Sequence, residues 1–296
     1  MTSILTNNSA NTALQLLKTT NNNLAKTQER ISSGLKVGTA ADNAAYWSIA
    51  TTMNSDKGAI DAANEAIGVG SAKVDVAYEG VDSAIKVLNE IKNKLTTASE
   101  GSTDNLQIQL EIGELQKQLG SIANGASFNG ENWLTRTDKT GTAFTSGEVV
   151  DGFVRNGTSV SVTKATVDLT NIALFDAVSA TGVGTGGLLG IVAAITLTAG
   201  DSQATIDGYL DSVEEAIGKL NTAGATLGSL QTRIGLQSDF ATKLSDALES
   251  GVGRLVDADM EEESARLSAL QTQQQLGIQA LSIANSSTQN ILSLFQ

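Results

Sequence analysis

The 296-residue sequence contains no cysteine, no histidine and no proline, and only 4% of its residues are aromatic. Without histidine the chain lacks the commonest general base and metal ligand of proteins. Without cysteine it has no thiolate nucleophile, no disulfide and no zinc–thiolate site. The remaining carboxylates, lysines and tyrosines form no recognisable catalytic pair. We therefore expect neither an enzyme nor a protein that binds a metal or a cofactor.

The same absences also bear on the fold. A chain without proline can form long, uninterrupted helices. Few aromatic residues argue against the densely packed core that a chain of this length could otherwise build. The composition therefore favours an extended helical protein over a compact one.

The chain has 32 acidic and 19 basic residues, a net charge of −13. This balance argues against nucleic acid as a partner, because phosphate binding needs clustered lysine and arginine. The first seventeen residues lack the basic start and apolar run of a signal peptide. The longest nearly apolar stretch, Leu188–Leu197, is about half the length that spans a bilayer. Composition alone suggests a cytoplasmic protein, unless export uses a route that reads no cleaved signal.

Two heptad repeats of apolar residues are the strongest positive signal in the sequence. A seven-residue repeat keeps one narrow stripe of a helix facing a partner helix, as in a coiled coil. The repeat in the first half consists of Ile60, Ile67, Val74, Val81, Leu88 and Leu95. The repeat in the second half consists of Ile206, Val213, Leu220, Leu227, Ile234, Ala241, Leu248 and Leu255. The predicted fold is mainly α, a long coiled-coil-like helical rod that pairs the N- and C-terminal segments, with a small β-containing central insert.

The two ends of the chain have apolar residues at a helical spacing but no charged side chain from Met1 to Leu17 or from Leu267 to Gln296. The N-terminal stripe is Ala10, Leu14, Leu17, Asn21, Leu24, Gln28, Ile31 and Leu35. The C-terminal stripe is Met260, Glu263, Leu267, Leu270, Gln274, Gly277, Leu281, Ala284, Thr288, Ile291 and Phe295. An ordinary pair of terminal helices explains the rhythm but not the missing charge, since a soluble monomer solvates its outer faces with charged side chains. We expect these ends to pack between molecules and to become ordered on assembly.

Periodicity and turn residues predict the remaining elements. Helices are expected over residues 4–34, 42–98 and 105–122, and from residue 201 to the C-terminus with a break at Gly251–Gly253. Turns are expected at residues 100–104, Asn124-Gly125 and Asn129-Gly130. Strands are expected over 149–154 and 160–167, joined at Asn156-Gly157. The glycine-rich stretch 182–187 is expected to be a flexible loop, because it lacks the Gly-Lys-Ser/Thr ending of a phosphate-binding loop.

Two segments resemble a known family. Glu29–Ala50 reads ERISSGLKVGTAADNAAYWSIA and closely resembles the signature near the start of bacterial flagellins, most of all those of rhizobium-like alphaproteobacteria. The C-terminal run, from DADMEEE at residue 257 to NILSLFQ at residue 290, resembles the flagellin C-terminus. The resemblance covers residues 1–135 and 200–296, and the middle of the chain resembles no family.

The resemblance implies a structural subunit that polymerises through its terminal helices into a tubular flagellar filament for swimming. Residues 1–42 and 253–296 would form the inner core of that filament, 43–135 and 201–252 a coiled-coil shell, and 136–200 a variable surface insert. The core packing would use Leu14, Leu17, Leu24, Ile31, Leu267, Leu270, Leu281, Ile291 and Phe295. The shell would use Ile60, Ile67, Val74, Val81, Leu88, Leu95, Leu220, Leu227 and Ile234.

The resemblance also implies partners and a location. The chain would leave the cell unfolded through the flagellar type III apparatus, and the absence of disulfides and slow prolyl isomerisation suits that route. Expected partners are other copies, with other flagellins in a mixed filament, and the export chaperone, cap and hook-junction proteins. The location would be the extracellular flagellum.

Two innate immune receptors recognise flagellins, and this sequence departs from both recognition patterns. In the stretch that plant receptor kinases read, many flagellins carry Lys-Asp-Asp-Ala-Ala-Gly. The corresponding residues 41–46 keep the acid at Asp42 but lose a charge and gain a bulky ring, with Asn43 and Tyr46 among the changes. The helix that the vertebrate Toll-like receptor contacts usually reads Arg-x-Arg-Glu-Leu. Here the corresponding residues, which include Lys92, Lys94 and Leu95, contain neither of the two arginines nor the acid. We expect weak stimulation of both receptors.

Several alternatives stay open or are excluded at this point. A hook–filament junction protein would share similar terminal helices, and an adhesive or glycosylated insert is compatible with Asn156-Gly157-Thr158. A metalloprotease insert is excluded, because its motif needs histidine. The Asp257–Glu263 acidic cluster fits the start of a helix better than a calcium loop. Tyr46 and Trp47 are expected to serve packing rather than recognition.

Overall fold

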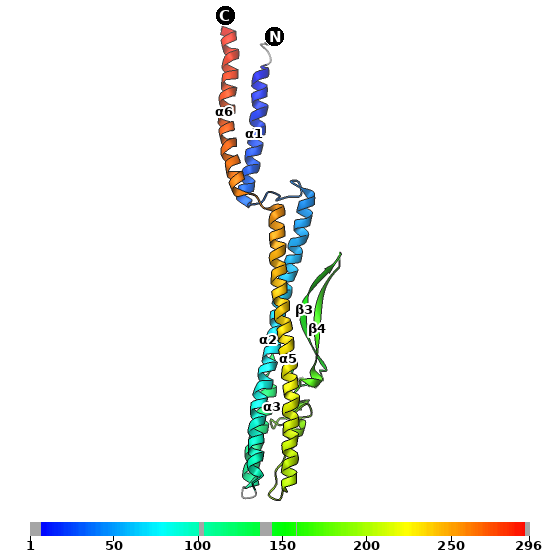
Figure 1. Ribbon diagram of the computed structural model, residues 1–296. Helices are drawn as coiled ribbons and strands as arrows, with labels where there is room; N and C mark the ends of the chain where they lie inside the picture. The colour runs from blue at the N-terminus through cyan, green and yellow to red at the C-terminus, as the bar shows by residue number, and fades with distance from the viewer. Residues whose placement is uncertain (1–6, 101–103, 137–143, 158, 294–296) are drawn as a thin grey trace. The chain divides into compact units, whose positions relative to one another are not determined.

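The computed structural model describes residues 7–100, 104–136, 144–157 and 159–293, with side chains described as far as residue 286. The chain divides into two compact units, one of residues 1–57 with 246–296 and the other of residues 58–245. Figure 1 shows their helices and strands. The predicted fold class is confirmed: helices dominate, N- and C-terminal segments pair, and short antiparallel strands lie between them.

The terminal unit is built around the helices α1, Asn8–Ser33, and α6, Met260–Ser293, which lie side by side (Figure 1). The side-chain oxygen of Asn7 accepts a hydrogen bond from the Ala10 N–H and so begins α1. Gly34 ends it with a φ of 72°, a left-handed conformation that glycine adopts without a steric penalty. The prediction of a helix over residues 4–34 is confirmed within the described residues.

A short backbone crossing fastens the base of this helix pair. The Ala258 N–H donates to the Gly34 carbonyl at 2.9 Å, and the Lys36 N–H donates to the Val256 carbonyl at 2.6 Å. Beside the crossing, Val37, Ala50 and Val256 form a small buried cluster. Backbone hydrogen bonds and apolar burial therefore tie the two ends of the sequence together.

The predicted helix break at Gly251–Gly253 is wrong. Helix α5, Gln203–Val256, runs through both glycines, and the break falls at residues 257–259. A glycine inside a helix costs only about 1 kcal/mol and keeps its N–H donor, so it does not end a helix by itself. The new helix begins where Asp259 accepts hydrogen bonds from the Glu261 and Glu262 N–H groups.

In the second unit, α2, Ala44–Ala98, pairs with α5 through the two heptad repeats. The six first-half residues from Ile60 to Leu95 have exposed fractions of 5% or less. Helix α3, Asn105–Gly125, packs onto the pair through Ile112 and Leu119. The Asp104 side chain begins α3, and the helix continues through Asn124-Gly125, so the turn predicted there is wrong.

The strands of the insert and of the segment just before it form three antiparallel pairs. The strands β1, Ser127–Phe128, and β2, Glu131–Asn132, are joined by a tight turn in which Asn129 and Gly130 both have positive φ, as predicted. The long hairpin of β3, Ser146–Asn156, and β4, Ser159–Asp168, carries a bulge at Asp151 and extends the predicted strands at both ends. The strand β6, Gly184–Thr185, lies within the stretch 182–187 that was expected to be a flexible loop and pairs with β5, Ala177–Val178, so that expectation is wrong in part. A 3₁₀ turn, Leu169–Asn171, and helix α4, Gly190–Ala193, complete the insert.

The insert is packed against the helices over much of its length. Val149, Leu174, Phe175, Leu189 and Val192 are buried in the same core as the heptad residues. The amide of Gln116 on α3 donates to the carbonyls of Val192 and Ile195, both at 2.9 Å. Only the outer half of the β3–β4 hairpin, residues 154–164, is exposed throughout its described residues. The insert therefore contributes to the hydrophobic core, which its Gly- and Thr-rich composition did not indicate.

Candidate functional site

The candidate site is a surface on the terminal helix pair, because large apolar side chains face solvent there within Met1–Leu17 and Leu267–Gln296, two stretches that contain no charged side chain. The exposed fractions are 42% for Leu14, 63% for Leu16, 58% for Leu276, 54% for Ile278 and 69% for Ile283. We call these five residues, which lie on more than one side of the two helices, the terminal outer surface. Such side chains are unusual on the surface of a monomeric protein when no charged residues surround them. The surface is therefore suited to apolar contact with another molecule.

Beneath this surface, α1 and α6 meet along a partly polar seam. On α1 the seam residues Leu17, Leu24 and Ile31 are half-buried, as predicted from the stripe. On α6 Leu270 is buried, and Leu267 and Leu281 are half-buried. The seam thus uses six of the nine residues predicted to pack the filament core.

The other three predicted core residues fall elsewhere. Leu14 is exposed and belongs to the terminal outer surface. Phe295 lies outside the described residues, and so does the side chain of Ile291.

The stripe predicted for α1 is wrong in its polar positions, because the buried residue is in each case the one before the predicted residue. Thr20 and Thr27 are buried, whereas Asn21 and Gln28, which the stripe included, are exposed. The Thr20 hydroxyl donates to the Leu16 carbonyl at 2.9 Å, which satisfies its hydrogen-bonding need inside the helix. Small side chains let the helices approach closely: a Cβ on Gly277 would lie 3.1 Å from Leu17 Cδ1.

Polar contacts between α1 and α6 fix their antiparallel alignment. The Asn7 amide donates to the Ala284 carbonyl at 2.9 Å, and the Gln274 amide donates to Asn21 Oδ1 at 2.8 Å. At the base of the pair, Arg30 Nη1 lies 3.0 Å from Glu263 Oε1. This ion pair puts a cation in the last turn of α1 and an anion in the first turn of α6, where the helix dipoles favour them.

The segment that resembles the plant-receptor signature forms a turn and the exposed start of α2. Asp42 Oδ2 accepts hydrogen bonds from the Thr39 N–H and hydroxyl, both at 3.0 Å, and these bonds lower the pKa of the Asp42 carboxyl. Asn43 Oδ1 accepts from the Ala45 and Tyr46 N–H groups and so begins α2. Tyr46 and Trp47 are 46% and 40% exposed, so the expectation that they pack is wrong within this chain.

The residues that align with the vertebrate-receptor signature are engaged inside the second unit. Leu95 is completely buried in the core. Lys92 forms an ion pair with Glu214, and Lys94 forms one with Glu111, each at 2.5 Å. The charge of both lysines is therefore balanced by carboxylates of the same chain.

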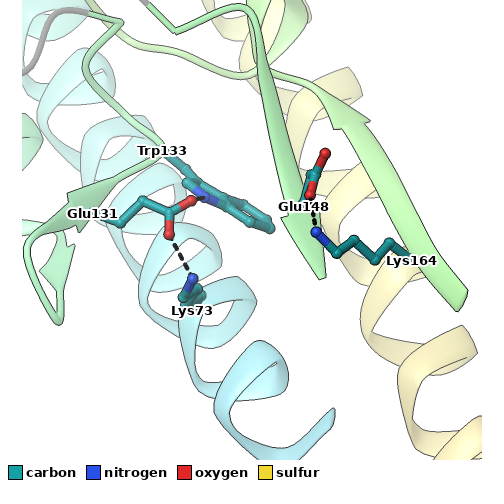
Figure 2. A network of polar contacts seen from close by, with 5 residues as sticks. All are labelled: Lys73, Glu131, Trp133, Glu148 and Lys164. Carbon is teal, nitrogen blue, oxygen red and sulfur yellow. Dashed lines mark hydrogen bonds and ion pairs between the residues drawn. The ribbon is translucent and has the colours of Figure 1, made fainter. Parts of the chain in front are cut away.

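A polar network fixes residues 131–133, just before the insert, to α2 in the second unit, as Figure 2 shows. The Lys73 ammonium lies 2.5 Å from Glu131 Oε2, and the Trp133 indole N–H donates to Glu131 Oε1 at 2.9 Å. Burial raises the pKa of the Glu131 carboxyl, but hydrogen bonds from Lys73 and Trp133 outweigh this effect, so the pKa lies below its ordinary value. Nearby on the hairpin, Lys164 pairs with Glu148 at 2.7 Å.

Chemistry of other kinds finds little support among the described residues. No group of three His, Cys, Asp or Glu residues there could hold a metal ion. A groove of about 660 Å³ lies between α2 and α3, lined by Glu90, Lys94, Glu111, Glu114 and Lys117 among others. Two ion pairs lie in this groove, Lys94 with Glu111 and Lys117 with Glu114. Among the helices described, none combines the length and hydropathy that a membrane span requires.

Comparison with known families adds independent information. The model described as "Bacterial flagellin N-terminal helical region" matches residues 4–139, and "Bacterial flagellin C-terminal helical region" matches residues 210–295. The sequence is 43% identical to Flagellin A of Rhizobium meliloti, with all of both chains covered. It is 46% identical to Flagellin C of Rhizobium meliloti (strain 1021) and 46% identical to a flagellin of Brucella melitensis biotype 1, again over both full lengths. Among solved structures, Bacillus cereus flagellin matches 62% of this chain and 94% of its own, at 17% identity and a TM-score of 0.45.

Proposed function

The chain belongs to the bacterial flagellin family, and from this premise we propose that its terminal outer surface is where copies of the chain contact one another in the flagellar filament. Membership of the family makes the protein a structural subunit of that filament and not an enzyme. Flagellins polymerise with themselves, and their filament is extracellular.

The observation that carries the proposal is the exposure of uncharged apolar side chains on α1 and α6. Burying a fully exposed leucine or isoleucine stabilises a complex by roughly 1.5–3 kcal/mol. Leu14, Leu16, Leu276, Ile278 and Ile283 retain 42–69% of their exposure in the single chain. Assembly that covers them would therefore gain several kcal/mol for each subunit. On α6, the absence of charged side chains beyond Leu267 means that burying Leu276, Ile278 and Ile283 would desolvate no ionised side chain of that segment.

We assign the rest of the chain by the same reasoning. Residues 1–42 and 253–296 form the inner core of the filament, residues 43–135 and 201–252 form a shell around it, and residues 136–200 face outward. The seam leucines and Ile31 shape the helix pair, and the terminal outer surface contacts neighbouring subunits. The buried heptad residues from Ile60 to Leu95 stabilise the shell within each subunit.

The same proposal includes further partners. The chain passes through the flagellar export apparatus and meets its export chaperone, cap and hook-junction proteins. Immune receptors bind it weakly, because Leu95 is buried and Lys92 and Lys94 are paired with Glu214 and Glu111. Reporter cells for the vertebrate receptor test this claim. A response equal to that of an enterobacterial flagellin would contradict it.

Seeded polymerisation tests the central proposal. Purified full-length chain is added to short filament fragments and growth is followed by electron microscopy, for the parent chain and for Ile283→Lys and Ile283→Val. Ile283 is 69% exposed, so neither substitution disturbs packing within the chain. We expect Ile283→Lys to stop or strongly slow growth and Ile283→Val to grow like the parent.

A deletion and an exchange measurement complete the test. Removing residues beyond Leu267 should abolish growth, and backbone amides of α1 and α6 should gain protection from hydrogen exchange on assembly. Undiminished growth of Ile283→Lys, or full amide protection of α1 and α6 in the monomer, would show that the terminal helices pack only within the chain.

A further inference from the structure

The sequence contains three Asn-Gly steps, at residues 124–125, 129–130 and 156–157. At such a step the backbone nitrogen of the glycine can approach the preceding side-chain amide, because glycine has no Cβ to obstruct it. We propose that Asn156 is a site of spontaneous covalent modification, where the side-chain amide is converted to a carboxylate through a cyclic imide. The fold selects this site from the three.

The reaction needs only water and base. The Gly157 nitrogen loses its proton and attacks Asn156 Cγ, a new C–N bond forms, and the Cγ–Nδ2 bond breaks as the nitrogen leaves as ammonia. Water then opens the five-membered imide at one of its two carbonyls. Opening at the main-chain carbonyl gives isoaspartate, whose backbone runs through the side chain, and opening at Cγ gives aspartate. No electrons are transferred in either step.

The first Asn-Gly step is protected by helical structure. Asn124 and Gly125 are the last two residues of α3, and the next residue, Ala126, donates its N–H to the Ile122 carbonyl at 3.1 Å. Asn132 fastens this end of the helix by donating its amide to the Ala123 carbonyl at 2.7 Å. Ring closure at Asn124 would require this packed helical end to unwind, which makes the step slow.

The second step lies in a turn that its neighbours fix. Asn129 and Gly130 have φ values of 51° and 83° and connect β1 to β2. The residue after the turn, Glu131, is bound by both Lys73 and Trp133, as Figure 2 shows. Distortion of this turn would therefore disturb a network that includes a buried tryptophan, and we expect an intermediate rate.

The third step lies where the fold restrains the backbone least. Asn156 is exposed at the end of β3 and pairs only with Ser159 across the hairpin. Gly157 has a φ of 64°, and no atom lies within 4 Å of where its Cβ would stand. The described residues from 154 to 164 are all exposed, and an unsupported two-stranded ribbon is marginally stable. The hairpin end can open without unpacking the core, so ring closure is least hindered there.

The local charge also favours the product. Residues 152–167 contain Arg155 and Lys164 but no carboxylate, although the whole chain carries a net charge of −13. A new carboxylate at Asn156 would therefore arise next to Arg155 in the sequence, whereas Lys164 lies further along the hairpin, opposite Val150. Isoaspartate would in addition lengthen the main chain at the residue that pairs with Ser159, and so disturb the hairpin register.

Peptide mapping by mass spectrometry tests the proposal. Full-length chain is incubated at mildly alkaline pH, once folded and once in denaturant, and the aspartate and isoaspartate forms of each site are quantified over time. In denaturant we expect similar rates at the three sites, since each has glycine next. In the folded chain we expect Asn156 to react several-fold faster than Asn124, with Asn129 between them.

The matched control is Asn156→Gln, whose longer side chain would have to close a larger ring. It should leave the residue 156 peptide unmodified and the other two rates unchanged. Equal rates at the three sites of the folded chain, or faster reaction at Asn124, would overturn the proposal. The chemistry needs no polymer, so its failure would leave the assignment of the terminal outer surface untouched.

Discussion

At the scale of single residues, Glu263 is the only charged side chain that is buried within the described part of the chain. Its Oε1 pairs with Arg30, and its Oε2 is buried with no hydrogen-bond partner among the described residues. Taking a carboxylate out of water is costly unless its partner holds it well. A buried pair of this kind stabilises less than apolar packing would, but removing one partner is strongly unfavourable.

We therefore predict that Glu263→Ala weakens the α1–α6 pair by about 1–3 kcal/mol, because Arg30 loses its partner. The loss stays below that of a fully buried pair, since the Arg30 side chain remains 30% exposed. The measurement is the temperature at which filaments depolymerise, which should fall. Glu261→Ala, at an exposed position in the same turn, is the control and should behave like the parent chain. Equal effects of the two substitutions would contradict a role for the ion pair.

The network of Glu131, Lys73 and Trp133 gives the fold a defined response to acid. The folded-state pKa of Glu131 is depressed, so its ionised form stabilises the folded chain above the unfolded pKa. That contribution is lost as the pH falls through the depressed folded value, which lies below 4.5. We expect Trp133 fluorescence to change over this acidic range, measured in a Trp47→Phe background because the chain has two tryptophans.

Glu131→Gln is the control for the acid response. The amide cannot ionise, so the variant should be less stable at neutral pH and should lose the part of the acid dependence that Glu131 supplies. If the fluorescence of both chains changed over the same pH range and to the same extent, another carboxylate would be responsible.

At the scale of elements, two glycines of α3 differ in what surrounds them. A Cβ on Gly120 would lie 1.9 Å from the backbone carbonyl oxygen of Gly182 in the insert, whereas a Cβ on Gly113 would meet nothing within 4 Å. Alanine favours a helix over glycine by about 0.5–1 kcal/mol. We predict that Gly113→Ala stabilises the chain by about that amount, and that Gly120→Ala destabilises it by about 1–3 kcal/mol through overpacking.

Denaturant unfolding of the two variants measures both effects, and each variant is the control for the other because they share a helix. If Gly120→Ala were as stable as Gly113→Ala, the segment around Gly182 would not be held against α3. The comparison thus tests whether the insert is an integral part of the second unit.

The sequence predicted the long helices well and the insert poorly, for a physical reason. A heptad repeat such as Ile60 to Leu95 reports its burial directly, because each apolar residue returns to the same helix face. The buried residues Leu174, Phe175 and Leu189 follow no period, since short strands and turns place them in the core. The close packing at Gly70 and Gly120 could not be predicted for the same reason. Only the structure shows that Val149 lies against Gly70 and that Gly182 lies against Gly120.

The terminal helices show where a periodic pattern misleads. The predicted α1 stripe included Leu14, which the structure leaves exposed. The contact with α6 instead passes through Ala13, Thr20 and Thr27. Leucines on the outer face and threonines in the seam reverse the usual rule that apolar residues lie inside. The lack of charged side chains over the ends supports a separate prediction, that other molecules surround them, without stating which residues those molecules contact.

At the scale of the whole molecule, charge and apolar surface act in opposite directions on assembly. The chain carries a net charge of −13 with a calculated pI of about 4.4, so copies repel one another at neutral pH. The ends carry no charge in Met1–Leu17 or Leu267–Gln296. Subunits can therefore come together there without setting like charges in contact, while the repulsion acts between the rest of their surfaces.

We predict that the critical concentration for seeded growth falls as sodium chloride is added at neutral pH. Salt screens the repulsion between subunits, with a Debye length of about 10 Å at 0.1 M. Sodium sulfate at equal ionic strength should lower the critical concentration further, because it also strengthens apolar burial. Sedimentation of polymer from monomer over a range of chain concentrations measures both effects. If ion pairs between subunits drove assembly, screening would weaken them, and a critical concentration that rises with salt would show that the terminal outer surface is not the main source of cohesion.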